Sequence, residues 1–144
     1  MIVIASDHAG VVLKAELIEI IREIGREVRD LGPADTQSVD YPDFAHRVAE
    51  AVSSGEAEMG VLVCGTGIGM SLSANRHPGI RAALCHDAFT AEMARRHNDA
   101  NILCMGARVI GGGVAAHMTK IFLAPTFEGG RHQRRVDRIE RGES

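Results

Sequence analysis

A chain of 144 residues with 16 lysines and arginines against 19 aspartates and glutamates carries a formal net charge of -3. That length suits one domain with its own apolar core. One tyrosine, four phenylalanines and no tryptophan provide few aromatic platforms, and the charge provides no basic surface, so a nucleic-acid partner is not expected. No apolar run approaches the length of a membrane span, and Met1 leads directly into an apolar segment, so we expect a cytoplasmic protein without a membrane partner.

Strands and helices alternate in the sequence pattern. Strands are predicted at residues 2–6, 27–31, 59–64, 80–84 and 101–105. Helices are predicted at about residues 13–24, 42–52, 70–75, 88–97, 114–122 and 131–141. This rhythm predicts a single α/β domain over residues 1–144, a three-layer αβα Rossmann-like sandwich with a five-stranded parallel sheet. We prefer the flavodoxin-like strand order 2-1-3-4-5, which makes the first and third strands neighbours.

The cysteines and most histidines give no sign of a metal site. Cys64, Cys85 and Cys104 are an odd number and form no C-x-x-C pair, which argues for thiols in a reducing compartment and against structural zinc. Cys85 and Cys104 are expected to be core residues. Four histidines also lack a mutual spacing typical of metal ligands: His46, His77, His86 and His117.

Residues 61–71 join an apolar strand, a cysteine, three alternating glycines and the start of a helix. Glycines let backbone N–H groups approach a ligand, and a helix N-terminus favours negative charge there. Cys64 in this position could act as a nucleophile or a base, or be a buried core residue. The loop lacks the G-x-G-x-x-G spacing and the P-loop lysine, and Met70 stands where a cysteine phosphatase needs arginine. Nucleotide binding and phosphatase activity are therefore disfavoured.

Asp7 and His8 follow the first predicted strand, and Cys64 ends the third. In the preferred order these strand ends are neighbours at the switch point, where doubly wound sheets bind ligands. We therefore expect Asp7, His8 and the Cys64 loop to form one site, although Asp7 also suits the N-cap of the following helix.

Two interpretations, a solvated surface or a functional site, are open for the segment 97–99 and for the C-terminal arginines. His-Asn-Asp at 97–99 ends a predicted helix, where a solvated cation is an ordinary feature. Arg131, Arg135 and Arg138 share one face of the predicted helix 131–141. Such charge runs are usually solvated, but this helix has few apolar anchors and the whole chain is acidic. The stripe is therefore a candidate phosphate clamp.

Taken together, these motifs resemble the type B ribose-5-phosphate isomerases, a family that includes the galactose-6-phosphate isomerase subunits. The resemblance spans nearly the whole chain. It rests on seven ordered segments, residues 6–10, 40–42, 64–69, 74–75, 79–82, 97–101 and 129–136.

The resemblance implies interconversion of ribose 5-phosphate and ribulose 5-phosphate through an enediolate, without metal or organic cofactor. Cys64 would move a proton between C1 and C2, Thr66 would hydrogen-bond the thiolate or the substrate, and His97 would open the sugar ring. The loop amides would hold the enediolate, those of Gly65, Gly67, Ile68 and Gly69. The remaining substrate contacts would come from Asp7 and Tyr41 near the sugar, Asn98 near the enediolate, and His8, Arg108, Arg131 and Arg135 at the phosphate.

The resemblance also implies a homodimer, or a dimer of dimers, whose active sites combine residues of two subunits. The helix 131–141 would then dock on a partner subunit. Two alternatives remain open from the residues: an isomerase of a galactose, allose or tetrose phosphate, and a non-catalytic flavodoxin-like nucleotide-binding module.

Overall fold

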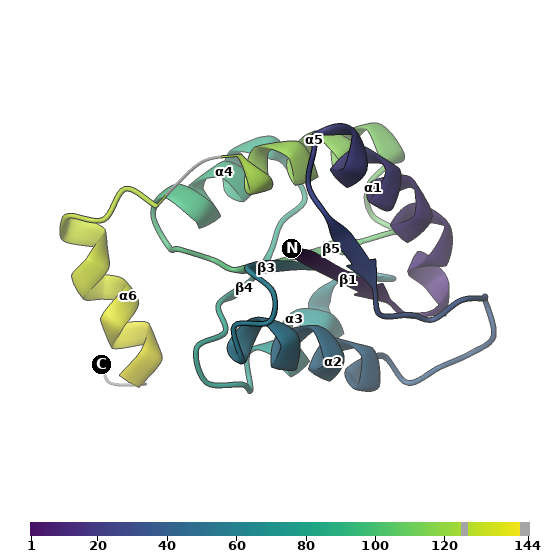
Figure 1. The fold of residues 1–144 in the computed structure, drawn as a ribbon, viewed down its shortest axis with the longest axis horizontal. Helices are drawn as coiled ribbons and strands as arrows, with labels where there is room; N and C mark the ends of the chain where they lie inside the picture. The colour runs from purple at the N-terminus through teal and green to yellow at the C-terminus, as the bar shows by residue number, and fades with distance from the viewer. Residues whose placement is uncertain (125–126, 142–144) are drawn as a thin grey trace.

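In the computed structural model, which describes residues 1–124 and 127–141, five parallel strands form the central sheet (Figure 1). They are β1 (Ile2–Ser6), β2 (Val28–Asp30), β3 (Met59–Cys64), β4 (Ala82–Leu84) and β5 (Ile102–Gly106). The helices are α1 (Val11–Glu23), α2 (Tyr41–Ser53), α3 (Ile68–Ala74), α4 (Ala88–Arg96), α5 (Gly112–Leu123) and α6 (Arg131–Arg141), with a short 3-10 turn η1 (His8–Gly10) before α1. The predicted α/β class is confirmed.

Helices cover both faces of the sheet. Figure 1 shows α1, α4 and α5 on one face and α2 and α3 on the other. Successive strand residues point to opposite faces, so β1 sends Ile2 and Ile4 into the first core and Val3 and Ala5 into the second. Interior strands of a sheet covered on both faces need apolar residues on both sides, which is why β1, β3 and β5 read as apolar runs. Cys85 and Cys104 lie in these cores as predicted.

The structure corrects the expected order of the last two strands. The sheet runs β2-β1-β3-β5-β4, not 2-1-3-4-5, while the expected neighbours β1 and β3 are confirmed. β5 is buried along its length and pairs with both β3 and β4, whereas β4 is short and partly exposed. A fully buried strand needs a partner on each side, and a short exposed one suits the edge. Right-handed crossovers then place α3 and α4 on opposite faces, because the direction of the chain across the sheet reverses between them.

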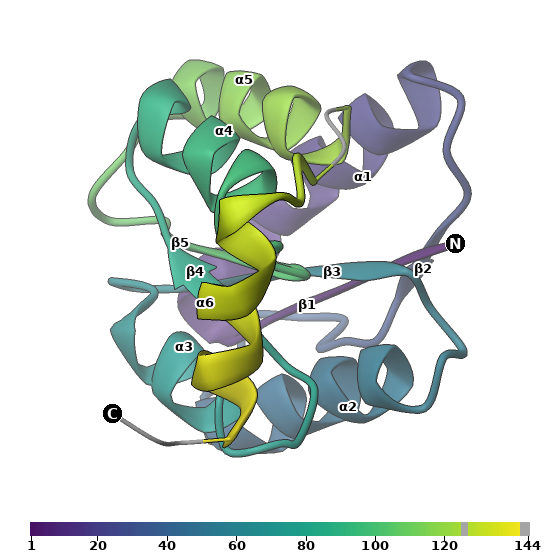
Figure 2. The same cartoon turned by 90° about the vertical axis from the view of Figure 1, so that its left-hand side faces the viewer.

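Helix α6 lies outside the three layers. Figure 2 shows it crossing the β4 side of the sandwich, from the layer of α4 toward the layer of α3. Only His132 and Val136 of this helix are buried. Its predicted docking on a partner subunit remains a prediction. Across residues 1–124 and 127–141, none of the helices has both the length and the apolar character needed to cross a bilayer.

Candidate functional site

The Cys64 loop is a tight turn at the C-terminal end of β3. Cys64 is buried, and its Sγ accepts a hydrogen bond from the Gly67 backbone N–H at 3.1 Å. Gly67 has φ +82°, and a Cβ built on it would lie 2.8 Å from the Met105 carbonyl carbon. The turn therefore requires glycine, both for its left-handed backbone and for its contact with β5. It directs a backbone N–H donor at the sulfur.

The loop amides are not equivalent. The N–H of Gly67 is directed to Cys64 Sγ, and that of Ile68 donates to Thr66 Oγ1 at 3.2 Å. Gly69 lies in the first turn of α3, where helix geometry leaves N–H groups without an intrahelical acceptor. Among the amides named from the sequence, those of Gly65 and Gly69 are thus the better donors for a ligand. The Thr66 hydroxyl forms a local turn with the first residue of α3.

Asp7 and His8 meet this loop, as the predicted β1–β3 pairing requires. The Asp7 N–H donates to the Val63 carbonyl at 3.0 Å, and the Asp7 carboxylate accepts from the N–H groups of Ala9 and Gly10 at 2.9 and 3.2 Å. The capping role foreseen for Asp7 is therefore real, and it fixes the backbone beside Cys64. His8 is held through its Nδ1, which accepts from the Val39 N–H at 3.3 Å.

Tyr41 and Arg108 complete this group of residues. The Tyr41 ring packs so closely over Gly69 that a Cβ there would collide with it. The Arg108 N–H donates to the Gly65 carbonyl at 3.0 Å, and its guanidinium Nη1 lies 3.2 Å from the place of a Gly65 Cβ. Glycine at position 65 thus leaves room for the Arg108 guanidinium, and glycine at position 69 leaves room for the Tyr41 ring.

We call the residues gathered around the C-terminal ends of the strands the thiol group. It consists of Asp7, His8, Tyr41, Cys64, Gly65, Thr66, Gly67, Ile68, Gly69 and Arg108. The other predicted residues form a second set, the histidine group: His97, Asn98, Arg131 and Arg135. One chain does not bring the two groups together. Helix α4 runs back from the C-terminal edge of the sheet and ends just before β5 begins. The histidine group therefore lies near the N-terminal ends of the strands, roughly 16 Å from the thiol group along the five residues of β5.

His132 lies beside the histidine group, and the sequence did not single it out. Its ring stacks on that of His97 with centroids 4.2 Å apart and an interplanar angle of 12°. Burial lowers the pKa of His132, and the nearby His97 and Arg131 lower it further. A signal was present in the sequence: His132 and Val136 lie four residues apart, on one side of α6 and about a third of a turn from the arginines.

Glu128 joins the two stacked histidines. Its Oε1 lies 3.7 Å from the Nε2 of both His97 and His132. These three side chains offer metal-ligand atoms within 4.8 Å of one another. However, Arg96 Nη1 lies 3.9 Å from the second Glu128 oxygen, and the nearly parallel rings do not aim their lone pairs at one point. These features fit a stacked histidine pair better than a site for a divalent cation.

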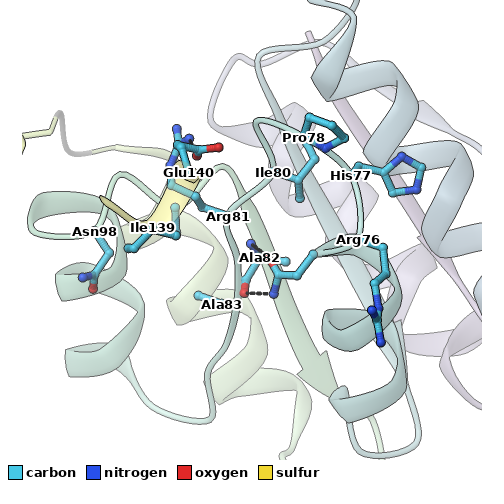
Figure 3. A pocket seen from close by; sticks show the side chains of 12 residues that line it. Arg76, His77, Pro78, Ile80, Arg81, Ala82, Ala83, Asn98, Ile139 and Glu140 are labelled. Carbon is cyan, nitrogen blue, oxygen red and sulfur yellow. Dashed lines mark hydrogen bonds and ion pairs between the residues drawn. The ribbon is translucent and has the colours of Figure 1, made fainter. Parts of the chain in front are cut away.

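A cavity of about 540 Å³ adjoins the histidine group, between α6 and the segment that joins α3 to β4 (Figure 3). Asn98, Arg81 and Glu140 are among the residues that line it. Both polar and apolar side chains line the cavity. This side of the molecule therefore has room for a ligand or for part of another chain.

Comparison with known families now places the chain. The model of the ribose/galactose isomerase family matches residues 2–139. The chain belongs to this family. A putative sugar phosphate isomerase of Bacillus subtilis, named YwlF, is 54% identical over 139 residues, which cover 96% of this chain and 93% of the relative.

Solved structures of the ribose/galactose isomerase family share the whole architecture. Ribose-5-phosphate isomerase B of Clostridium thermocellum has a TM-score of 0.95 at 49% identity and covers 97% of this chain and 95% of its own. Ribose-5-phosphate isomerase B of Mycoplasma genitalium, solved with bound ribulose-5-phosphate, has a TM-score of 0.94 at 43% identity and covers 98% of this chain and 94% of its own. The family resemblance expected from the motifs is confirmed.

Proposed function

We propose that this protein is a cofactor-independent aldose–ketose isomerase that interconverts ribose 5-phosphate and ribulose 5-phosphate through an enediolate. The observation that carries the proposal is the thiol group itself: a cysteine with a backbone donor on its sulfur, in a glycine turn that leads into a helix N-terminus, in a member of the ribose/galactose isomerase family. A structural relative with ribulose-5-phosphate bound supports the choice of sugar.

In the proposed reaction, the Cys64 thiolate takes the proton from C2 of the open-chain aldose. The electron pair left on C2 forms the C1–C2 double bond, and the C1 carbonyl becomes an enediolate oxygen. The amides of Gly65 and Gly69 stabilise that charge as it develops, which is worth about 3 kcal/mol for each donor in comparable sites. The proton of the C2 hydroxyl passes to the C1 oxygen, the thiol returns its proton to C1, and the C2 carbonyl forms. Thr66 keeps the loop in place through its bond to the Ile68 N–H.

The remaining roles follow the chemistry of the side chains. His97 opens the sugar ring by moving a proton between the ring oxygen and the anomeric hydroxyl, and Asn98 acts beside the enediolate. Asp7 and Tyr41 contact the sugar hydroxyls. The phosphate is held by His8, Arg108, Arg131 and Arg135, since guanidinium groups bind phosphate oxygens in pairs. The three cysteines are free thiols, which is consistent with a cytoplasmic location.

A complete active site needs two copies of the chain. The thiol group and the histidine group lie at opposite edges of one chain, so the thiol group of one copy would face the histidine group of another. Large apolar side chains are exposed beside the thiol group, with Ile68 and Leu72 on α3 at 50% and 65% exposure and Val109 at 54%. A second copy would cover this surface. We therefore propose a homodimer, which could pair further into a dimer of dimers.

Sugar preference and phosphate recognition are tested together. Purified protein assayed against four-, five- and six-carbon aldose phosphates should turn over ribose 5-phosphate fastest. Arg135→Ala should raise the KM for phosphorylated sugars at least tenfold, because a paired charge-assisted bond is lost, while binding of free ribose changes little. Equal losses for free and phosphorylated sugars would remove Arg135 from the phosphate site. Stabilisation by nucleotides and not by sugar phosphates in thermal unfolding would favour the nucleotide-binding alternative.

Sharing of the active site between two copies is tested by complementation. Cys64→Ala and Arg135→Ala chains should each be impaired alone. Co-expressed, they should form mixed dimers in which one of the two sites has both residues intact, so activity should recover to about a quarter of the wild-type value for random pairing. Measured activity no higher than that of the separate variants would mean that Cys64 and Arg135 serve within one chain.

A further inference from the structure

We propose that Arg81 is a positioning residue that fixes helix α6 relative to the segment His97–Asn98. Arg81 belongs to neither the thiol group nor the histidine group, and it has no contact with substrate in the mechanism above. The inference rests on the proposed isomerase function, because it explains how residues that act on one substrate are kept in register. Its basis is a set of contacts that the Arg81 side chain makes in two directions.

The first set of contacts joins Arg81 to Asp99, the residue that follows Asn98. Arg81 Nε donates to the Asp99 carbonyl at 2.7 Å, and Nη2 lies 3.3 Å from the Asp99 carboxylate. Asp99 has φ +48°, a left-handed conformation that costs free energy in any residue with a Cβ. Arg95 also holds this carboxylate, at 3.0 Å. Arg81 and Arg95 therefore stabilise the strained turn on which His97 and Asn98 are displayed.

The second direction is toward helix α6. Arg81 Nη1 forms an ion pair with Glu140 Oε1, and the Gly79 N–H donates to the other Glu140 oxygen at 3.2 Å. Figure 3 shows Arg81 and Glu140 meeting at the wall of the cavity, with Ile139 of α6 beside them. The Arg81 and Glu140 side chains are 18% and 32% exposed. This burial makes the pair stronger than one at the open surface, where solvent screens the charges.

Few residues of helix α6 are buried, so its position depends on a small number of side-chain contacts, which we call ties. His132 and Val136 are its buried residues, and the cavity of about 540 Å³ occupies much of the space between its C-terminal half and the α3–β4 segment. The helix is held near its start by the stacking of His132 on His97 and near its end by Glu140 on Arg81.

Both ties lead back to the same short segment. His97 carries the first tie, and Asp99, two residues later, carries the second through Arg81. Of the phosphate-binding arginines proposed on α6, Arg135 lies between the two ties and Arg131 directly precedes the first. A shift of the 97–99 turn therefore moves the helix with it, and the distance from the ring-opening histidine to the phosphate is kept constant. This is the geometric condition for acting on two ends of one sugar phosphate.

The test uses the full chain with Glu140→Gln, Arg81→Gln and the double variant. Glu140→Gln keeps the shape of the side chain and removes its charge. It should raise the KM for ribose 5-phosphate about tenfold while kcat stays within twofold, because the phosphate arginines lose their fixed position and the thiol group is untouched. The double variant should be no worse than Arg81→Gln alone, since both changes break one connection. Arg29→Gln, which breaks the exposed Arg29–Glu56 pair of 3.3 Å, is the matched control and should leave both constants unchanged.

Amide hydrogen exchange gives a readout that does not depend on turnover. Exchange in residues 131–141 should be at least fivefold faster in Glu140→Gln than in wild type, and unchanged in Arg29→Gln. A lower melting temperature with unchanged KM would show a purely structural role and overturn the inference. If the wild-type protein isomerises no sugar phosphate, the proposed function fails, and exchange alone then decides whether Arg81 fixes α6: unchanged exchange in Glu140→Gln overturns that as well.

Discussion

Cys64→Ala is expected to abolish the exchange of the substrate C2 proton with solvent. Without the sulfur, no group in the thiol group is placed to accept that proton, and loss of a general base typically lowers the rate about 10²–10⁴-fold. Proton NMR in deuterated buffer measures the exchange directly, independently of product formation. Binding of a sugar phosphate should stay within a few fold of wild type, because Cys64 is not among the residues proposed to bind the phosphate.

Cys85→Ala is the matched control for this experiment. Cys85 is also a buried thiol just beyond the end of a strand, but burial raises its pKa, so it remains protonated at neutral pH. Its replacement removes the same atom without removing the proposed base, and exchange should continue at nearly the wild-type rate. Wild-type exchange in Cys64→Ala would eliminate Cys64 as the base.

Gly67→Ala is expected to reduce both stability and activity. A side chain at φ +82° costs about 1–2 kcal/mol, and the added Cβ would press on the backbone of Met105, which adds about 1–3 kcal/mol for overpacking. Any movement that relieves the collision displaces the donor from Cys64 Sγ. Chemical denaturation should show the loss of stability, and kcat should fall while the melting transition remains cooperative.

Gly25→Ala separates backbone strain from steric collision. Gly25 has the same φ of +82°, but nothing lies within 4 Å of the place of its Cβ. It should therefore show only the loss due to the left-handed backbone, with activity unchanged. If Gly67→Ala and Gly25→Ala lost equal amounts of stability, the contact between the Cys64 loop and β5 would have no energetic weight.

Much of the fold, and the meeting of two segments of the candidate site, followed from local patterns. Alternating strands and helices predicted the parallel sheet, and the pairing of β1 with β3 brings Asp7 against the strand that ends at Cys64. The order of β4 and β5 did not follow, because both segments are short and apolar and only their burial distinguishes them. Ala82–Leu84 is partly exposed and Ile102–Gly106 is buried throughout, a difference that depends on which helices come to lie above each strand.

The histidine group was harder to recognise for a related reason. His97 alone is an unremarkable helix end, and His132 within an arginine-rich helix resembles a solvated residue. Their stacking and the shared carboxylate of Glu128 arise only when α6 folds back to α4. The family resemblance supplied His97, Arg131 and Arg135, but sequence spacing alone could not relate segments separated by thirty or more positions.

The position of β5 between β3 and β4 also constrains how the chain folds during synthesis. β4 has β5 as its neighbour in the sheet, yet residues 82–84 leave the ribosome before residues 102–106. Until β5 emerges, the nascent chain can complete only the sheet β2-β1-β3, with the apolar edge of β3 unpaired. Unpaired apolar edges invite association between chains. The interval between completing the Cys64 loop and inserting β5 beside it is therefore the stage of biosynthesis at which this protein is most exposed to aggregation.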